Sequence, residues 1–395
     1  MKGKKLTAII FTIIIGSMMC LLLASGFLKD FVTDYRNTVP KGTPVLERVT
    51  EAIDIFETLI VEQTPFHDKF IEVYGASLIA MGKKTLPDPN YSYLYKTKEG
   101  QITYLVNERD TKPLAEKIVA LKKSLEKENI PFLYVQAPFK LMDDKDITPL
   151  EFNYSTENTN TFLKALEENN VSILDLRPYF KTLKEEGAPI SSLFYNTDHH
   201  WTIESSLYAT NIIADTVKNQ YNVPLNLSLL SKDNFAFETK DKSFIGSLGR
   251  RTGKVYAGTD SFTLILPSYE TDIVVYETDY GITTEKRGPF SESVLVKSYL
   301  EDKSLTSNRY AAYHGDNEEL VFINNKNEGG KVLIIKDSFG VPVYSFMSLS
   351  AREVRAIDPR LYKGKLSDYA KKYKPDVVVF LYNEDSLNKN MFLWE

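Results

Sequence analysis

Short apolar runs alternate with amphipathic helical segments along most of this 395-residue chain, and this alternation constrains the fold more than any other feature. The runs rich in β-branched residues predict strands at 130–136, 171–176, 332–335, 353–358 and 376–382. The segments with helical periodicity predict helices at 112–129, 159–168, 177–186, 203–219, 342–349 and 366–373. Because such alternation is typical of βαβ units, we expect an α/β fold with a parallel sheet flanked by helices.

Two regions depart from this rhythm. Residues 226–325 contain many turn residues and the β-like pieces 261–266 and 272–277, which predict a β-rich insertion. Residues 91–106 predict a hairpin that turns at Lys98-Glu99-Gly100.

The composition, 43% hydrophobic and 26% charged, is that of a chain with a packed core. A net charge of −5 argues against nucleic-acid binding, which needs basic surface.

The N-terminus predicts the cellular location. Three lysines within residues 1–5 precede an uncharged apolar run at 6–28, which is long enough to cross a bilayer as a helix. The basic start favours the cytoplasmic side, so we expect a single-pass anchor in the cell membrane with the remaining chain extracytoplasmic. A cleaved signal peptide, cut near Ala24-Ser25-Gly26, is the alternative. The only cysteine, Cys20, lies in this run, so the exported part contains no disulfide.

The remaining chain divides by pattern into two parts. A short polar spacer at 31–41 precedes predicted helices at 45–62 and 66–81. We therefore expect an anchor at 1–28, a helical stalk or cap at 29–90, and a catalytic domain at 91–395.

Polar residues follow several of the predicted parallel strands. Reactive groups of such sheets gather at the carboxyl ends of the strands. The residues at these positions are Gln136, Asp175, Ser338, Asp358 and Asn383.

The stretch Asp198-His199-His200-Trp201 contains two of the four histidines and one of the two tryptophans. A carboxylate beside an imidazole fixes its tautomer and stabilises its protonated form, as a catalytic base requires. Ser338 stands at a tight turn after a predicted strand, where a serine can act as a nucleophile. The Ser338 backbone N–H and the Asn383 side chain are candidate oxyanion donors.

Each of these features also has a simpler interpretation. In that interpretation, Asp337 and Ser338 cap a helix, His199 and His200 hydrogen-bond to the backbone, and Trp201 packs in the core, all without a catalytic role. A metal site at Asp198, His199 and His200 is a further alternative. Adjacent histidines seldom point at one ion, and no cysteine is available, so we expect no metal and no cofactor.

Taken together, these residues resemble the DHHW family, which is named for the motif at 198–201. The chain is also similar to the alginate O-acetyltransferase group, whose flavodoxin-like, SGNH-hydrolase-like fold has circularly permuted catalytic blocks. Asp198, His200 and Trp201 match the Asp-x-His-Trp motif of that group, and residues 337–339 match its Asp-Ser-Phe motif. The resemblance implies Ser338 as nucleophile, with His200 as its base and Asp198 orienting the base.

The resemblance extends over roughly residues 90–395 and implies further site residues. The strand before Asn383 is similar to the SGNH segment that supplies an oxyanion asparagine, although the usual glycine two positions earlier is missing. Other implied or adjacent candidates for oxyanion or substrate binding are Trp201, His199, Tyr313, His314 and Gly315.

For function, the resemblance implies a membrane-anchored, extracytoplasmic serine-dependent O-acetyltransferase or acetylesterase that acts on a cell-surface or secreted polysaccharide. It also implies a multipass membrane O-acyltransferase as a partner. Transfer and hydrolysis share one acyl-enzyme and differ only in the acceptor, so the sequence leaves both open. A non-catalytic glycan-binding or assembly protein on the same fold is the alternative, and a metal-dependent hydrolase is a third hypothesis.

Overall fold

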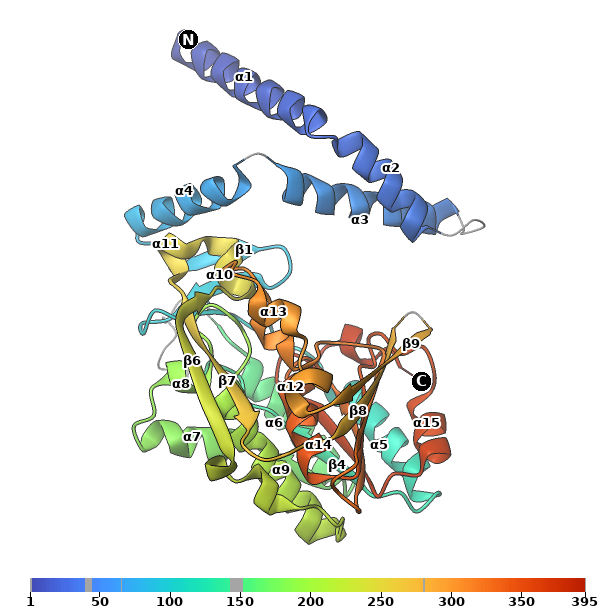
Figure 1. Ribbon diagram of the computed structural model, residues 1–395. Helices are drawn as coiled ribbons and strands as arrows, with labels where there is room; N and C mark the ends of the chain where they lie inside the picture. The colour runs from blue at the N-terminus through green and yellow to red at the C-terminus, as the bar shows by residue number, and fades with distance from the viewer. Residues whose placement is uncertain (1, 40–44, 65, 143–151, 280, 395) are drawn as a thin grey trace. The chain divides into compact units, whose positions relative to one another are not determined.

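The computed structural model describes residues 2–39, 45–64, 66–142, 152–279 and 281–394. The chain forms two compact units, Met1–Ala80 and Met81–Glu395. Figure 1 shows the ribbon of the chain, coloured from the N-terminus to the C-terminus. The second unit is built on an eight-stranded sheet in the order β5-β4-β13-β11-β12-β10-β8-β9. Five neighbouring strands are parallel, as predicted: β5 (Ile173–Asp175), β4 (Phe132–Gln136), β13 (Val377–Tyr382), β11 (Lys331–Lys336) and β12 (Glu353–Ile357).

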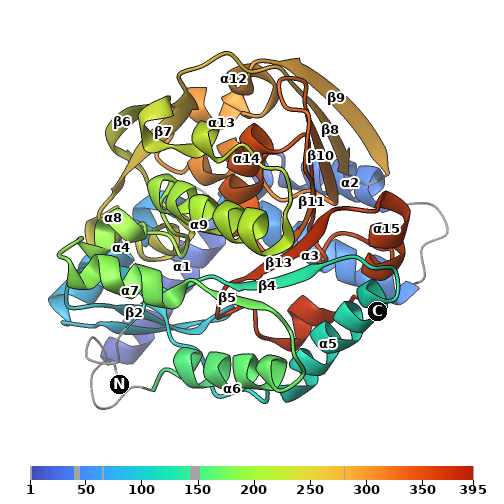
Figure 2. The ribbon, with the colours of Figure 1, turned by 90° about the horizontal axis from the view of Figure 1, so that it is seen from below.

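Helices bury both faces of this parallel region. Figure 2 shows α9 (Ile203–Tyr221) and α14 (Gly340–Ser350) on one face, and α5 (Lys112–Glu126) and α6 (Ser155–Glu167) on the other. Alternate strand residues enter two separate cores, since successive side chains of a strand point to opposite faces. Among the described residues, this unit also contains the helices α7 (Arg177–Glu185), α8 (Ile190–Leu193), α10 (Ser247–Thr252), α11 (Lys254–Ala257), α12 (Phe290–Ser293), α13 (Lys297–Glu301), α15 (Leu366–Tyr373) and the 3₁₀ turns η2 (Leu227–Leu230), η3 (Lys232–Asn234), η4 (Arg309–Tyr313) and η5 (Lys389–Phe392).

The expectation of an entirely parallel sheet beside a separate β-rich insertion is wrong at one edge. β10 (Glu319–Asn324) pairs antiparallel with β12, and β8 (Ile273–Asp279) and β9 (Ile282–Gly288) continue the sheet antiparallel. Of the described part of 226–325, β6 (Phe235–Phe244) and β7 (Asp260–Pro267) form a separate two-stranded pair. Apolar periodicity identifies a strand but not the direction of its partner, so the sequence could not reveal that the sheet is mixed.

A three-stranded antiparallel sheet precedes the α/β region. It consists of β1 (Thr85–Asp88), β2 (Ser92–Lys96) and β3 (Ile102–Tyr104). The predicted turn between β2 and β3 is confirmed, and Gly100 adopts φ +89° there, a conformation that favours glycine.

The N-terminal unit is helical. Its helices are α1 (Lys2–Ala24), α2 (Phe27–Thr38), α3 (Val45–Gln63) and α4 (His67–Ala80). The apolar run does not form one helix to residue 28, because the chain bends at Gly26, which has φ +96°. The polar spacer expected at 31–41 is helical through Thr38, and positions 40–41 lie outside the described residues.

Among the described residues, no single helix is both long and apolar enough to span a membrane. The segments Ile15–Ala24 and Phe27–Arg36 are bent by 59° relative to each other, and the two together are long and apolar enough by length and composition.

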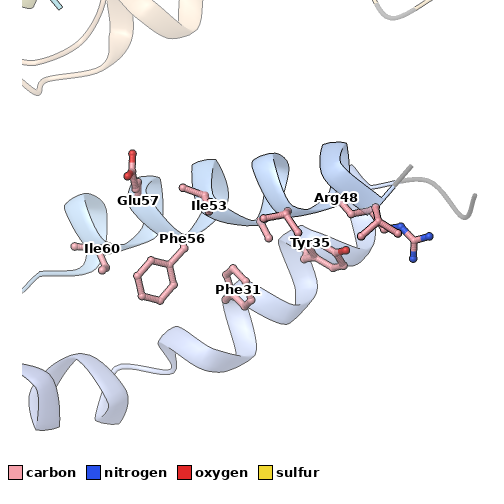
Figure 3. A pocket seen from close by; sticks show the side chains of 10 residues that line it. Phe31, Tyr35, Arg48, Ile53, Phe56, Glu57 and Ile60 are labelled. Carbon is pink, nitrogen blue, oxygen red and sulfur yellow. The ribbon is translucent and has the colours of Figure 1, made fainter. Parts of the chain in front are cut away.

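Aromatic contacts join α2 to α3. Phe56 packs edge-on against Phe27 at 5.3 Å and against Phe31 at 6.0 Å between ring centroids. Beside these rings lies an open groove of about 950 Å³, lined mainly by apolar side chains such as Tyr35 and Ile53 (Figure 3). The Gln63 side chain also donates to Asp30 of α2 at 2.8 Å.

Candidate active site

The turn that carries Ser338 follows directly from the buried strand β11. The preceding Asp337 accepts hydrogen bonds from the Phe339 N–H (2.9 Å), the Asn383 N–H (2.7 Å) and the Ser386 hydroxyl (2.6 Å). Burial nevertheless raises the pKa of Asp337 above its ordinary value. These bonds fix the turn to the end of β13 and leave Ser338 partly exposed just before α14.

The Asp198–Trp201 stretch forms a loop immediately before α9. Phe194 and Trp201 pair across the base of the loop, and Thr202 caps α9 by accepting from the Ser205 N–H at 3.1 Å. Lys140, which is buried, donates to the carbonyls of Tyr195 (2.5 Å) and Asp198. Burial lowers the pKa of Lys140 to about 8, so its ammonium form still supports the loop at neutral pH.

Ser338, His200 and Asp198 form one continuous chain of hydrogen bonds. The His200 Nε2 lies 2.7 Å from the Ser338 Oγ, and the His200 Nδ1 lies 2.6 Å from the Asp198 Oδ1. Since a carboxylate only accepts, Nδ1 carries the proton, and Nε2 presents its lone pair to the serine hydroxyl. The structure thus brings together the three residues that the sequence analysis proposed as nucleophile, base and orienting acid.

Asp198 is held in its ionised form by its neighbours. Its burial alone would raise the pKa, but the neighbouring imidazoles of His200 and His199, together with the hydrogen bond from His200, outweigh this effect and hold the pKa well below its usual range. The Ser247 N–H at the start of α10 adds a hydrogen bond to Oδ2 at 2.7 Å. A Cβ on Gly246 would lie 2.2 Å from the Asp198 Cβ, so only glycine permits this close approach.

His199 lies beside the base without joining the chain of hydrogen bonds. Its ring centroid is 3.8 Å from that of His200, and its Nδ1 is 3.2 Å from the Ser247 Oγ. Burial and the nearby His200 charge lower the pKa of His199 to about 3, so its ring is neutral at physiological pH.

The donor atoms of Asp198, His199 and His200 lie within 4.8 Å of one another, a spacing that would suit a metal ion. However, both ring nitrogens of His200 already have partners, Asp198 and Ser338. An ion bound there would have to replace one of these two hydrogen bonds.

Sequence reasoning missed Tyr310, which lies in η4. Its ring stacks on the His200 imidazole at 4.0 Å with 13° between the planes. Its hydroxyl accepts from the Trp201 indole N–H (3.1 Å) and lies 3.1 Å from the Ser338 carbonyl oxygen. No strand or helix pattern marked residues 309–313, so nothing in the sequence pointed to this residue.

Sequence reasoning also missed a group of charges at the ends of β11 and β12. The buried Lys336 pairs with Asp358 at 2.9 Å and with Asp316, and Arg360 pairs with both carboxylates. Burial opposes the ionisation of Asp316, but Lys336 and Arg360 outweigh it and lower its pKa. The expected strand-end residue Asp358 therefore takes part in an ion-pair network.

Three other strand-end groups are engaged in local contacts. Gln136 donates to the Ala137 and Tyr382 carbonyls, and Asp175 pairs with Arg177 at 2.8 Å. The Asn383 side-chain oxygen accepts from the Ser386 N–H at 2.9 Å. The Asn383 backbone N–H donates to Asp337, the residue before Ser338. The role of the Asn383 side chain as an oxyanion donor stays a prediction.

The structure does not bring the side chains of Tyr313 and His314 to Ser338. The Tyr313 hydroxyl donates to the Ile265 carbonyl of β7 at 3.0 Å. His314 is buried, with its ring nitrogens 2.9 Å from the Val294 carbonyl oxygen and 3.2 Å from Glu277. Gly315 accepts a hydrogen bond from the Tyr344 hydroxyl. Trp201 is fully buried and packs on Phe339 at 5.1 Å, so it supports the site from within the core.

Comparison with known proteins agrees with this fold. Residues 93–272 match the family model described as SGNH hydrolase-like domain, acetyltransferase AlgX. This segment contains the DHHW motif and ends before Ser338. The predicted resemblance is therefore confirmed, and the second unit has an SGNH-hydrolase-like α/β fold with a mixed sheet.

Solved structures show the same architecture. Bacillus cereus PatB1 has a TM-score of 0.60 and 21% identity, covering 79% of this chain and 99% of that chain. PatB1 with a sulfonyl adduct has a TM-score of 0.62 and 18% identity, covering 76% and 99%. A DHHW family protein from Eubacterium siraeum has a TM-score of 0.57 and 18% identity, covering 78% and 96%. No curated protein sequence matches the chain.

Proposed function

We propose that this protein is a serine-dependent O-acetyltransferase or acetylesterase in which Ser338, His200 and Asp198 form the catalytic triad. The observation that carries the proposal is the position of the His200 imidazole, which has one nitrogen on Ser338 and the other on Asp198. An imidazole held between a hydroxyl and an ionised carboxylate is the arrangement that activates a serine.

The reaction would proceed in two stages. The His200 Nε2 takes the Ser338 proton while Oγ attacks the carbonyl carbon of an acetyl ester, and Asp198 stabilises the resulting imidazolium. Collapse of the tetrahedral intermediate breaks the bond to the leaving alcohol, which receives the proton from His200, and leaves acetyl-Ser338. A sugar hydroxyl or water then attacks the acetyl group with His200 again as base, which regenerates the free serine.

The turn before α14 also supports oxyanion stabilisation. In the part of the chain that the structure describes, the Ser338 backbone N–H donates to no protein group. It stands at the N-terminal end of an 11-residue helix, where partial positive charge favours an anion. We propose this N–H as an oxyanion donor, with the Asn383 side chain as a second donor.

The acetyl group is proposed from the description of the matched family model as an acetyltransferase. The proposed acceptor is a cell-surface or secreted polysaccharide, following the resemblance to the alginate O-acetyltransferase group. A multipass membrane O-acyltransferase is the proposed partner that supplies the acyl group.

We further propose that the N-terminal helices anchor the protein in the cell membrane with the catalytic unit outside. The basic residues before the apolar α1 and the bent pair α1–α2 support this location. Cell fractionation tests it: the full chain should sediment with membranes, and a chain starting at residue 81 should not. Recovery of the full chain in the soluble fraction would contradict the anchor.

The decisive test of activity is the rate of ester cleavage by Ser338→Ala. The variant should lose activity on a chromogenic acetyl ester by at least ~10³-fold. Ser228→Ala, which alters an exposed serine in η2, is the control and should match the parent. If Ser338→Ala also matches the parent, the nucleophile is assigned wrongly.

A second readout does not depend on the choice of ester. The PatB1 structure with a sulfonyl adduct motivates treating this protein with a sulfonyl fluoride. Mass spectrometry should locate one adduct on Ser338, formed more slowly in His200→Ala. Glycan binding by a parent protein that shows neither labelling nor ester turnover would favour the non-catalytic alternative.

A further inference from the structure

Tyr310 connects the candidate base to the turn of the candidate nucleophile. The residue is only 3% exposed, so it is not placed to touch a substrate. Its ring lies parallel to the His200 imidazole at 4.0 Å, while its hydroxyl reaches the carbonyl oxygens of Ser338 (3.1 Å) and Phe339 (3.3 Å). One side chain therefore contacts both partners of the 2.7 Å hydrogen bond between His200 and Ser338.

The direction of the hydrogen bonds at the Tyr310 hydroxyl is determined by Trp201. An indole N–H can only donate, so the Tyr310 oxygen accepts from it and must direct its own proton to the Ser338 or Phe339 carbonyl. Burial raises the pKa of Tyr310 well above its ordinary value, so the hydroxyl keeps this proton at all physiological pH values. The hydrogen-bonded connection from Trp201 to the serine turn therefore does not change with pH in that range.

The stacked ring supplies a constraint that Asp198 cannot. The Asp198 carboxylate holds the imidazole at its edge, through Nδ1. The Tyr310 ring lies against the face of the imidazole at 4.0 Å and limits how far its plane can tilt. The rings of His199 at 3.8 Å and Phe339 at 5.4 Å also lie beside the imidazole, but both are tilted to it. Because hydrogen bonds weaken steeply with misalignment, the plane of the imidazole determines how well Nε2 meets the serine hydroxyl.

We propose that Tyr310 is a positioning residue for the acyl-transfer reaction, since it aligns the imidazole plane of His200 with the backbone that carries Ser338. This inference rests on the proposed function. It adds a role for the 226–325 region, which provides the residue that aligns two catalytic groups from elsewhere in the chain.

Steady-state kinetics on a chromogenic acetyl ester tests the inference. Tyr310→Phe keeps the stacked ring and loses the hydroxyl, so kcat should fall ~10-fold with KM within about twofold of the parent value. Tyr310→Leu loses both contacts, and kcat should fall ~100-fold. The fall should appear in kcat because Tyr310 acts through His200 and Ser338 and does not bind the substrate.

Tyr313→Phe is the matched control. Tyr313 lies in the same 3₁₀ turn and is also buried, but its hydroxyl bonds to the Ile265 backbone of β7. The control should lose thermal stability to a similar degree as Tyr310→Phe and keep kcat within about twofold of the parent.

The rate of sulfonyl fluoride labelling distinguishes partial unfolding of a variant from misalignment of its His200 ring. The folded fraction of each variant is measured by circular dichroism, and dividing the observed pseudo-first-order rate constant for sulfonyl fluoride attack on Ser338 by that fraction gives the rate constant of the folded molecules. We expect that rate constant to fall in Tyr310→Phe and to be unchanged in Tyr313→Phe.

Equal rate constants and equal kcat values for these two variants would overturn the positioning role, and so would a change confined to KM. The proposed function would survive that result as long as Ser338→Ala is inactive. Full activity of Ser338→Ala would instead remove the function and this inference together.

Discussion

The His200 Nε2 lies 2.7 Å from the Ser338 Oγ, although 138 positions separate the two residues in the chain. The packing of α9 against α14 brings them together. His200 lies in the loop that enters α9, and Ser338 lies in the turn that enters α14. Both helices cover the same face of the parallel sheet (Figure 2), and the hydrogen bond between His200 and Ser338 joins the segments that enter them.

Replacing Asp198 by asparagine tests whether the carboxylate orients the base. An asparagine amide can donate to Nδ1, which would favour the imidazole tautomer that carries its proton on Nε2 and cannot accept from Ser338. We expect kcat on an acetyl ester to fall by ~10³–10⁴-fold while the protein stays folded. A loss of less than about tenfold, with the fold verified by circular dichroism, would show that Asp198 does not orient His200.

Gly246→Ala tests the close approach between α10 and the Asp198 loop. The added Cβ would lie 2.7 Å from the Asp198 Cα, and backbone atoms cannot move away as a flexible side chain can. We expect the free energy of unfolding to fall by about 1–3 kcal/mol, together with a loss of activity.

Ser247→Ala is the matched comparison for this position. It removes the Ser247 hydroxyl near His199 but keeps the backbone N–H that binds Asp198, so its effect should be much smaller. Urea unfolding and ester turnover measure both variants. Equal behaviour of the two would mean that the glycine is not required.

Glu384 predicts a pH dependence of stability. Burial raises the pKa of this carboxyl to about 7 from its ordinary value of 4.5, so the folded protein holds a proton that the unfolded chain releases. Raising the pH from 4.5 through 7 therefore costs stability, on the order of 2–3 kcal/mol. Below pH 4.5 both states are protonated and this contribution is fully present.

The Glu384→Gln variant isolates that contribution, because an amide keeps an acceptor for the Phe139 N–H and does not titrate. Free energies of unfolding measured at pH 5 and pH 8 should differ between parent and variant by about the same 2–3 kcal/mol. Parallel curves for the two proteins would show that Glu384 is already ionised in the folded state at pH 5.

Chelation distinguishes the serine mechanism from a metal-dependent one. Because both nitrogens of His200 are engaged by protein atoms, we expect ester turnover to persist after treatment with a chelator. Elemental analysis of protein purified without chelator should find less than one zinc per chain. Stoichiometric zinc, with activity lost on its removal and restored on its return, would favour the metal-dependent hydrolase instead.

Much of the fold could be predicted from the sequence because its local patterns are strong. The run Val377–Tyr382 is apolar at every position, and both of its faces are buried between helices, as a central parallel strand requires. The edge of the sheet could not be predicted in the same way. The half-exposed strand β10 has the same alternation whether its neighbour runs parallel or antiparallel.

Some residues of the candidate site could be predicted from the sequence, and others depend on the packing. Asp198, His200 and Ser338 could be chosen in advance because their residue types and motifs suit acyl transfer. Tyr313 and His314 were chosen for their place in the chain, but the packing against β7 and β8 directs their side chains elsewhere. Tyr310, three residues earlier, makes the contact with His200.

The sequence by itself determined the five parallel strands, the main helices that flank them and the identity of the reactive side chains, because hydrophobic periodicity and chemical type are local properties. Only the tertiary structure decided that the Asp198–Trp201 loop meets the Ser338 turn and that Tyr310 lies against both. Such a meeting depends on how α9 and α14 pack on one sheet, and helix packing is set by contacts between residues that are distant in the chain.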